Sequence, residues 1–241
     1  MLLKRPGFTL TAAITLALGV GANTAVFGLV HKILIAHLPV AEPERLVVFS
    51  RINLEERGMM GFPHFFYQEL EAERDIFDGA LCRADSYERV TIGAEKGGEP
   101  AIGELVSGSF FQVLGVKPNV GRLFTREDDV TPGGHPVVVL SYRYWQRRFG
   151  GDPSVVGRTL LLTAHPMTVI GVSPPGFDGL DHGQRIDLRV PLAMSVELRG
   201  GTRRGPSTPN QRGPWGLNIV GRLKRGVSVE RPPQGPRKLG L

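Results

Sequence analysis

A glycine-rich stretch near the N-terminus is the first candidate for chemistry. Residues 19–24 read GVGANT and approximate the G-x-G-x-x-G/A loop that cradles a dinucleotide pyrophosphate, and Glu42 or Glu44 follows about 20 residues later, where an acid would bind the ribose. The third glycine is absent, and Pro39 and Pro43 would interrupt the helix that must follow such a loop. The stretch therefore does not predict a nucleotide site.

Two groups of acidic residues are candidates for a cation site. Residues 127–129 are three consecutive acids, and Asp178, Asp181 and Asp187 surround His182 in a glycine-rich loop. A hard cation such as Ca²⁺ takes about six to eight oxygen ligands, and no further ligands stand at a recognisable spacing. We interpret the first group as a solvated turn, and nothing marks the second group as catalytic.

The common catalytic signatures are absent from the sequence. Ser141 stands in VLSYR, without the glycines of a G-x-S-x-G nucleophile elbow, and the histidines form neither H-x-x-x-H nor H-E-x-x-H. There is no Walker A motif, so the chain cannot hydrolyse ATP by that route. We predict no catalytic residue, no cofactor and no bound metal.

A long apolar run near the N-terminus contains the glycine-rich stretch. Residues 6–30 carry no charge, and as a helix they would span about 37 Å at about 1.5 Å per residue, enough for a hydrocarbon core of about 30 Å. Lys4 and Arg5 precede the run, which favours a cytoplasmic N-terminus. The sequence predicts a cytoplasmic segment at 1–7 and a transmembrane helix at 8–36. A cleavable signal peptide is the alternative, although its apolar region is usually only about 7–15 residues long.

Small residues recur on two faces of the predicted helix. On one face a small residue recurs every four positions from Ala13 to Ala25, with Thr24 beside this row. The second face carries Asn23. In lipid, small residues let a neighbouring backbone approach, and a buried amide needs a hydrogen-bond partner. We predict that the helix packs against other membrane helices through Ala13, Ala17, Gly21, Ala25, Asn23 and Thr24.

After Pro39 the pattern becomes that of a soluble domain. Short strands and short helices intermix without regular βαβ spacing, which predicts an α+β fold. We expect strands at 46–51, 89–93, 102–106, 136–141, 159–163, 167–172 and 217–223, and helices at 62–73, 110–114 and 142–149. Ser109 should cap the second helix and Gly115 should end it, and Thr125 with Asp128 resembles a capping box.

Charge is distributed unevenly along the chain. Residues 199–241 hold ten Lys and Arg against one acid, whereas residues 42–198 hold 16 basic and 22 acidic residues. The globular part is therefore acidic, and we predict no nucleic-acid partner, since only the basic tail could attract one. The single cysteine, Cys82, excludes an intrachain disulfide.

Several ordered blocks of the sequence resemble a known family. They are RPGFTLTAAITLALGVGANTAVFGLVHKIL, PERLVVF, GELVSGSFFQVLGVKPNVGRLFTREDD, HPVVVLSYRYWQRRFGGDPSVVGRTL and VIGVSPPGF. These blocks are similar to the permeases of MacB-like, FtsX-type ABC transporters, and within that family they most resemble predicted permeases abundant in acidobacteria. The likeness runs from about residue 5 to residue 230, nearly the whole chain.

The resemblance implies a fold, a location and partners. It implies one transmembrane helix followed by a MacB-like periplasmic core domain at 37–230, with a porter-like α+β part and an inserted second part. The location would be the bacterial inner membrane, with a single pass and most of the chain in the periplasm. The partners would be other permease subunits, as a dimer, a separate ATPase subunit and a periplasmic adaptor. In such transporters, ATP hydrolysis in the cytoplasm is transmitted through the helices to the periplasmic part.

The sequence also departs from the family. It has no ATPase domain, no later apolar run long enough to cross a membrane, and a basic tail rich in proline and glycine at 231–241, where a helix should begin. We therefore expect a truncated, non-catalytic permease subunit that transmits ATP-driven motion for export. The alternative is a secreted or membrane-anchored extracytoplasmic binding module with no transport role.

Overall fold

The computed structural model describes most of the second of two compact units. The units are Met1–Leu38 and Pro39–Leu241. The described residues are 40–53, 58–93, 97–181, 184–198 and 216–227. The predicted cytoplasmic segment, the predicted transmembrane helix and the 231–241 tail all lie outside them. Within the described residues, no helix is both long and apolar enough to cross a membrane.

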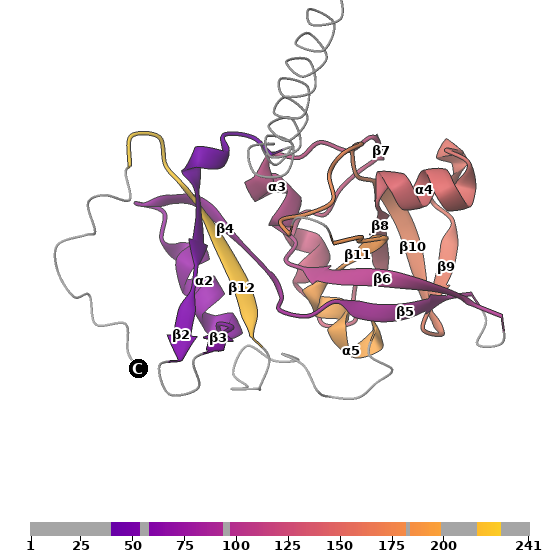
Figure 1. Cartoon of the computed structure of the whole chain (residues 1–241), viewed down its shortest axis with the longest axis horizontal. Helices are drawn as coiled ribbons and strands as arrows, with labels where there is room; N and C mark the ends of the chain where they lie inside the picture. The colour runs from indigo at the N-terminus through magenta and orange to yellow at the C-terminus, as the bar shows by residue number, and fades with distance from the viewer. Residues whose placement is uncertain (1–39, 54–57, 94–96, 182–183, 199–215, 228–241) are drawn as a thin grey trace, which may run out of the picture. The chain divides into compact units, whose positions relative to one another are not determined.

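A ten-stranded mixed sheet organises the domain (Figure 1). Its strands follow the spatial order β1-β12-β4-β6-β11-β8-β10-β9-β5, with β7 paired to β10. They are β1 (Leu46–Phe49), β4 (Phe77–Ala84), β5 (Glu88–Ile92), β6 (Glu99–Val106), β7 (Val120–Gly121), β8 (Val137–Leu140), β9 (Thr159–Leu162), β10 (His165–Val172), β11 (Leu188–Pro191) and β12 (Leu217–Leu223). A separate ribbon pairs β2 (Arg51–Asn53) with β3 (Gly58–Met60).

Six of the strands close into a ring. β5 pairs with both β6 and β9, so the order β6, β11, β8, β10, β9, β5 returns to β6. Two neighbouring pairs in the ring, β8 with β10 and β6 with β11, are parallel. The hairpin of β9 and β10 turns through Thr163 and Ala164, whose φ angles of 49° and 68° suit the tight turns that match strand twist.

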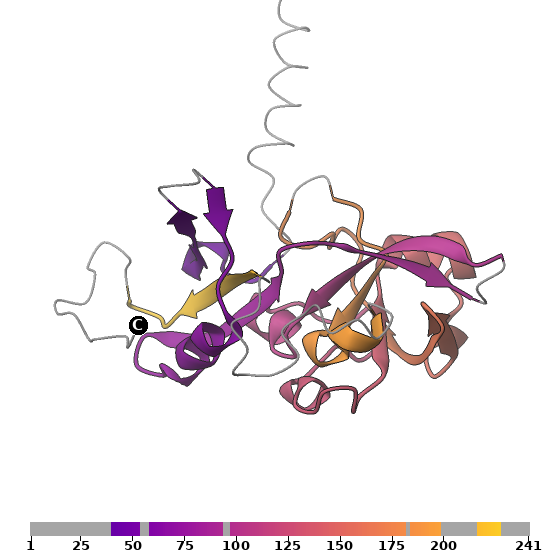
Figure 2. The same ribbon diagram turned by 90° about the horizontal axis from the view of Figure 1, so that it is seen from below.

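The remaining strands form a second part beside the ring. β1, β12 and β4 come from the two ends of the described chain, and the ring is built from the residues between them. Figures 1 and 2 both show these three strands toward one end of the domain and β9, β10 and α4 (Tyr142–Phe149) toward the other. The inserted ring and the three-stranded part are thus distinct in topology, although they share one sheet.

Two helices cover opposite faces of β4. Ala80 and Cys82 lie in the same apolar cluster as Tyr67 of α2 (His64–Ala72). Leu81 lies in the other cluster, with Phe110 of α3 (Phe110–Leu114). Successive side chains of a strand point to opposite faces, so the alternation places α2 and α3 on the two sides of the sheet. Both apolar clusters also contain ring residues, and the two parts of the domain therefore share their cores.

Short helical turns complete the described chain. They are η3 (Pro43–Arg45), η4 (Arg126–Asp129), η5 (Pro153–Val155), η6 (Leu192–Met194) and α5 (Ser195–Leu198).

Most of the predicted elements are confirmed, and so is the α+β class. The helices at 110–114 and 142–149 and the strand at 217–223 have the predicted bounds. The strand expected at 46–51 is confirmed at Leu46–Phe49, but its predicted end is wrong, because β1 ends at Phe49 and β2 begins at Arg51 in the other sheet. β4 and β11 are strands that the sequence pattern does not predict.

Two of the predicted helix caps are confirmed and one is wrong. Gly115 ends α3 in the left-handed region with φ 69°, and the Thr125 N–H donates to the Asp128 carboxylate at 2.9 Å, both as predicted. The Ser109 cap is wrong, because the Ser109 hydroxyl donates to the Ala80 carbonyl at 2.7 Å and makes no cap hydrogen bond.

Candidate functional site

The residues predicted to pack the membrane helix lie outside the described residues. Their roles therefore remain predictions. They are Ala13, Ala17, Gly21, Ala25, Asn23 and Thr24. Among the described residues, the candidate site lies where the chain enters the sheet at β1 and leaves it at β12.

The first and last described strands form one antiparallel pair. β1 and β12 are aligned over four residue pairs, from Leu46 opposite Arg222 to Phe49 opposite Ile219. Because the strands run in opposite directions, the beginning of β1 and the end of β12 lie at the same end of the pair. The incoming and outgoing segments of the domain are therefore neighbours.

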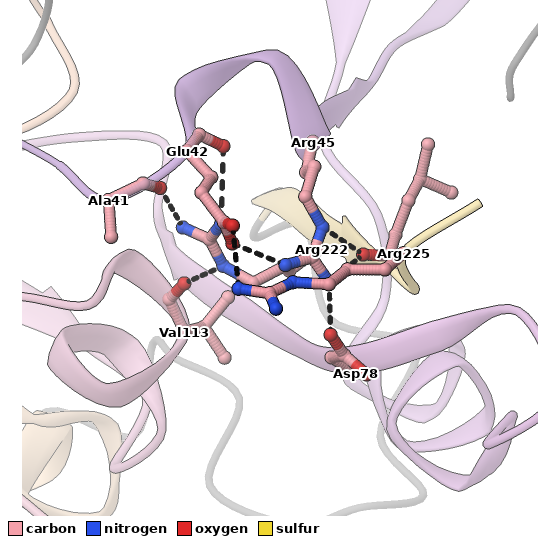
Figure 3. Close-up of polar contacts among 8 residues, drawn as sticks. Ala41, Glu42, Arg45, Asp78, Val113, Arg222 and Arg225 are labelled. Atoms are coloured by element: carbon pink, nitrogen blue, oxygen red, sulfur yellow. Dashed lines mark hydrogen bonds and ion pairs between the residues drawn. The ribbon is translucent and has the colours of Figure 1, made fainter. Parts of the chain in front are cut away.

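Arg222 joins three segments at this end of the pair (Figure 3). Only 8% of the residue is exposed, and its guanidinium donates to three backbone carbonyls. Nε donates to Val113 at 2.5 Å, Nη1 to Glu42 at 3.2 Å and Nη2 to Ala41 at 2.6 Å. Val113 lies in the last turn of α3, where helix carbonyls lack partners within the helix. One side chain of β12 thus binds both α3 and the segment that leads into β1.

Arg45 makes the reciprocal connection from the incoming segment. Its Nε and Nη2 donate to the Leu223 carbonyl at 2.9 and 2.5 Å, and its guanidinium also pairs with the carboxylates of Glu42 and Asp78. The Glu42 carboxylate bridges to Arg225 at 2.9 Å. Figure 3 shows these contacts converging on one spot. We call the five charged residues the strand-end cluster: Glu42, Arg45, Asp78, Arg222 and Arg225.

The charges of the strand-end cluster act on one another. The hydrogen bond from Arg45, assisted by the charge of Arg225, lowers the pKa of the Glu42 carboxyl. Burial and the nearby charge of Arg45 lower the pKa of the Arg222 guanidinium. Arginine nevertheless stays protonated in proteins, so Arg222 keeps all its donors. The three carbonyls that it binds take the place of a carboxylate partner.

Two backbone features hold the incoming segment against α3. Glu42 has φ 43° in the left-handed region, which costs about 1–2 kcal/mol for a residue with a Cβ. The conformation persists because Arg222 binds the carbonyl of Glu42 while Arg45 and Arg225 bind its carboxylate. The Ala41 N–H donates to the Leu114 carbonyl at 2.9 Å. A Cβ on Gly115 would lie 2.5 Å from the Ala41 Cβ, so the close approach requires glycine.

The run of three acids is not a solvated turn, and that interpretation is wrong. Asp128 is buried and pairs with Arg122 at 2.6 Å. Asp129 accepts the N–H of Gly108 at 3.0 Å and the N–H of Ala193 at 2.7 Å. Burial raises the pKa of Asp129 to about 6. Both carboxylates therefore serve to connect segments of the fold.

The described residues gather no group with the geometry of a metal site. Across these ranges, no three His, Cys, Asp or Glu side chains could together hold a metal ion. Cys82 is fully buried in β4, and burial raises the pKa of its thiol well above the ordinary value, which disfavours the nucleophilic thiolate. Asp181 and Asp187 are each paired with an arginine, while His182 lies outside the described residues.

Sequence reasoning missed the strand-end cluster. Its one sequence signal is the arginine in LNIVGRL, a charge within an otherwise apolar strand. The partners of Arg222 are backbone carbonyls 109 to 181 residues away along the chain. No spacing of residue types identifies a carbonyl at such a separation.

The fold and this site define a class of protein: an α+β domain in which the first and last described strands form one pair and a ring of strands is inserted between them. The profile of the MacB-like periplasmic core domain matches residues 9–231. The chain belongs to the MacB-like periplasmic core domain family. The resemblance to MacB-like ABC transporter permeases inferred from the sequence is thereby confirmed.

Solved structures share the fold at low sequence identity. The periplasmic region of MacB from Actinobacillus actinomycetemcomitans is 18% identical, with 83% of each chain covered and a TM-score of 0.56. The extracellular domain of the noncanonic ABC-type transporter YknZ from Gram-positive bacteria is 16% identical, covering 75% of this chain and 84% of that one, with a TM-score of 0.52. A domain of a Porphyromonas gingivalis protein assigned as a permease is 15% identical, covering 80% and 79%, with a TM-score of 0.52. No curated protein matches the chain.

Proposed function

We propose that the chain is a non-catalytic permease subunit of a MacB/FtsX-type ABC transporter. Residues 8–36 would anchor it in the bacterial inner membrane in a single pass, with the described domain on the extracytoplasmic side. The domain would receive movement driven by ATP hydrolysis in a separate subunit and use that movement for export. Membership of the family supports this class of function.

The observation that carries the proposal is the pairing of the incoming and outgoing strands. A displacement of the residues before β1 reaches β12 through four aligned residue pairs and through the Arg222 guanidinium. A flexible linker at this position would absorb such a displacement, whereas a bonded strand pair passes it to the sheet. The strand-end cluster is therefore suited to couple movement of the N-terminal segment to the whole domain.

The proposed partners follow from the same role. They are the membrane, other permease subunits in a dimer, a separate ATPase subunit and a periplasmic adaptor. The contact with other permease helices would be made by the small-residue face that includes Ala17, Gly21 and Ala25, with Asn23 hydrogen bonded across the interface.

A membrane two-hybrid assay with a full-length permease of the same family tests this role. The full chain should associate with the permease. Gly21→Leu should abolish the signal, because a large side chain keeps the two backbones apart. Gly21→Ala is the matched control, since alanine keeps position 21 small, and it should retain most of the signal. Equal signals from both variants would contradict the proposed helix contact.

N-terminal sequencing of the mature protein separates the proposal from a secreted binding module. A permease subunit keeps residues 8–35, because they form its membrane helix. Removal of these residues, with release of the domain from the membrane fraction, would refute the permease role and favour a secreted module.

A further inference from the structure

The three-stranded part and the ring meet through a short backbone joint. Among the described strands, the pairing of β4 with β6 is the one that connects the two parts, and it aligns a single residue pair, Arg83 with Val106. The Ser107 N–H adds one hydrogen bond to the Cys82 carbonyl at 2.8 Å. A joint this short constrains the angle between the two parts much less than a full ladder would.

A buried ion network crosses the same joint. Arg83 of β4 donates to Glu104 of β6 at 3.2 Å and to both carboxylate oxygens of Asp181 at 2.8 Å. Arg189 of β11 donates to the other oxygen of Glu104 at 2.8 Å. Two guanidinium groups therefore face two carboxylates, and the charges balance. Arg189 and Glu104 are each 1% exposed, and Arg83 is 8% exposed.

The loop between β10 and β11 is held by the same network. The Arg189 guanidinium lies 4.9 Å from the centroid of the Phe177 ring and donates to the Asp178 carbonyl at 3.1 Å. Gly179 has φ 112°, which residues with a side chain rarely adopt, and a Cβ there would also lie 2.7 Å from Arg189 Nη2, so glycine suits the point where the loop passes the arginine. Asp181 also accepts a hydrogen bond from the Tyr87 hydroxyl.

The network adds direction to a contact that is apolar over most of its area and has hydrogen bonds at Ser107 and Ser109. The shared cores attract the two parts without prescribing an angle, because burial of apolar surface is non-directional. Charged hydrogen bonds, and a bidentate guanidinium in particular, require fixed geometry. Buried ion pairs often add little net stability, since desolvation offsets their attraction. The contribution of this network is therefore orientation.

We infer that Arg83 is a positioning residue that fixes the angle between the ring and the three-stranded part through Glu104 and Asp181, so that the two parts turn as one body. The inference rests on the proposed function for its purpose, because an export subunit must carry movement from the strand-end cluster into the ring. The fixed angle itself is a property of the chain and can be measured without any transport assay.

Distance measurement between two spin labels tests the inference on the purified full chain in detergent. Val48 of β1 and Leu161 of β9 are 66% and 41% exposed, so cysteines at these positions can carry labels. The native Cys82 is fully buried and stays unlabelled. The parent chain should give one narrow distance distribution. Arg83→Met should broaden that distribution or add a second distance.

Two further variants keep the test decisive. Arg158→Met breaks the exposed pair with Asp152 within the ring and should leave the distribution narrow. Asp181→Asn removes the exposed member of the network and should broaden the distribution even if Arg83→Met fails to fold. A distribution as narrow as the parent's in Asp181→Asn, and in folded Arg83→Met, overturns the inference. Failure of the proposed function is recognised separately, by the two-hybrid assay and N-terminal sequencing on chains without these substitutions.

Discussion

Replacement of Arg222 by methionine is the sharpest test of the strand-end cluster. Methionine keeps an unbranched apolar stem but removes the three hydrogen bonds to Val113, Glu42 and Ala41. The Val113 carbonyl is buried, and leaving such an acceptor unpaired costs about 1–3 kcal/mol. The Glu42 and Ala41 carbonyls are more accessible and can bind water, while loss of a buried charge relieves some desolvation. We expect a net loss of about 2–3 kcal/mol in the free energy of unfolding.

Calorimetry on the full chain gives the first readout. In a domain of this size, 1 kcal/mol shifts the Tm by about 2–4 °C, so Arg222→Met should lower the Tm by about 4–12 °C. Arg222→Lys keeps the charge but cannot reach three carbonyls with one ammonium group, and its Tm should fall between the two. Arg158→Met removes an exposed ion pair and should change stability by less than about 0.5 kcal/mol.

Hydrogen exchange gives the second readout, which is local. The Ala41 N–H is bonded to Leu114, and this bond depends on Arg222 holding the incoming segment in place. Its exchange should accelerate in Arg222→Met more than exchange in the ring does. An unchanged Tm together with unchanged protection of Ala41 would refute the idea that Arg222 joins β12 to the incoming segment.

Three other predictions concern the described domain. Burial raises the pKa of Asp129 to about 6, so ionisation of this carboxyl opposes folding, and the free energy of unfolding should fall as pH rises from about 4 through about 6. In urea unfolding, Asp129→Asn should remove up to about 3 kcal/mol of that fall. An identical pH dependence in both chains would contradict this prediction. Gly115→Ala should lower the Tm more than Gly150→Ala. Both glycines have positive φ, but only the Cβ added at position 115 would collide with Ala41. Equal decreases in Tm would show that residue 115 and Ala41 are not in tight contact. Cys82 should react with a thiol reagent only after urea unfolding, and prompt labelling of the native chain would show that β4 is accessible.

Local signals explain why some elements were predictable. α4 begins where the Ser141 side chain accepts the Tyr144 N–H at 3.2 Å, and it ends at Gly150 in the left-handed region with φ 60°. Both signals are carried by residues within or next to the helix itself, so they can be read in the sequence. The apolar pattern of β12 is local in the same way, and its bounds agree with the structure.

Distant partners explain why other elements were missed. β4 reads FDGALCRA, which has few β-branched or aromatic residues, and it becomes a strand because β12 pairs along nearly its whole length. Ser109 stands where a cap residue should, but the Ala80 carbonyl takes its hydroxyl. The acids at 127–129 suggested a solvated turn because the N–H donors to Asp129 stand 21 and 64 residues away.

The sequence by itself determined the family, the α+β class and the ends of two helices, because these depend on residue patterns that lie within short stretches. Only the tertiary structure decided that six strands close into a ring and that the first and last described strands form one pair. It also decided that Arg83 joins β4 to the ring and that Arg222 joins β12 to α3 and the incoming segment. The physical reason is that the partners of these arginines are carbonyls and carboxylates from remote segments. Their positions exist only after the chain has folded.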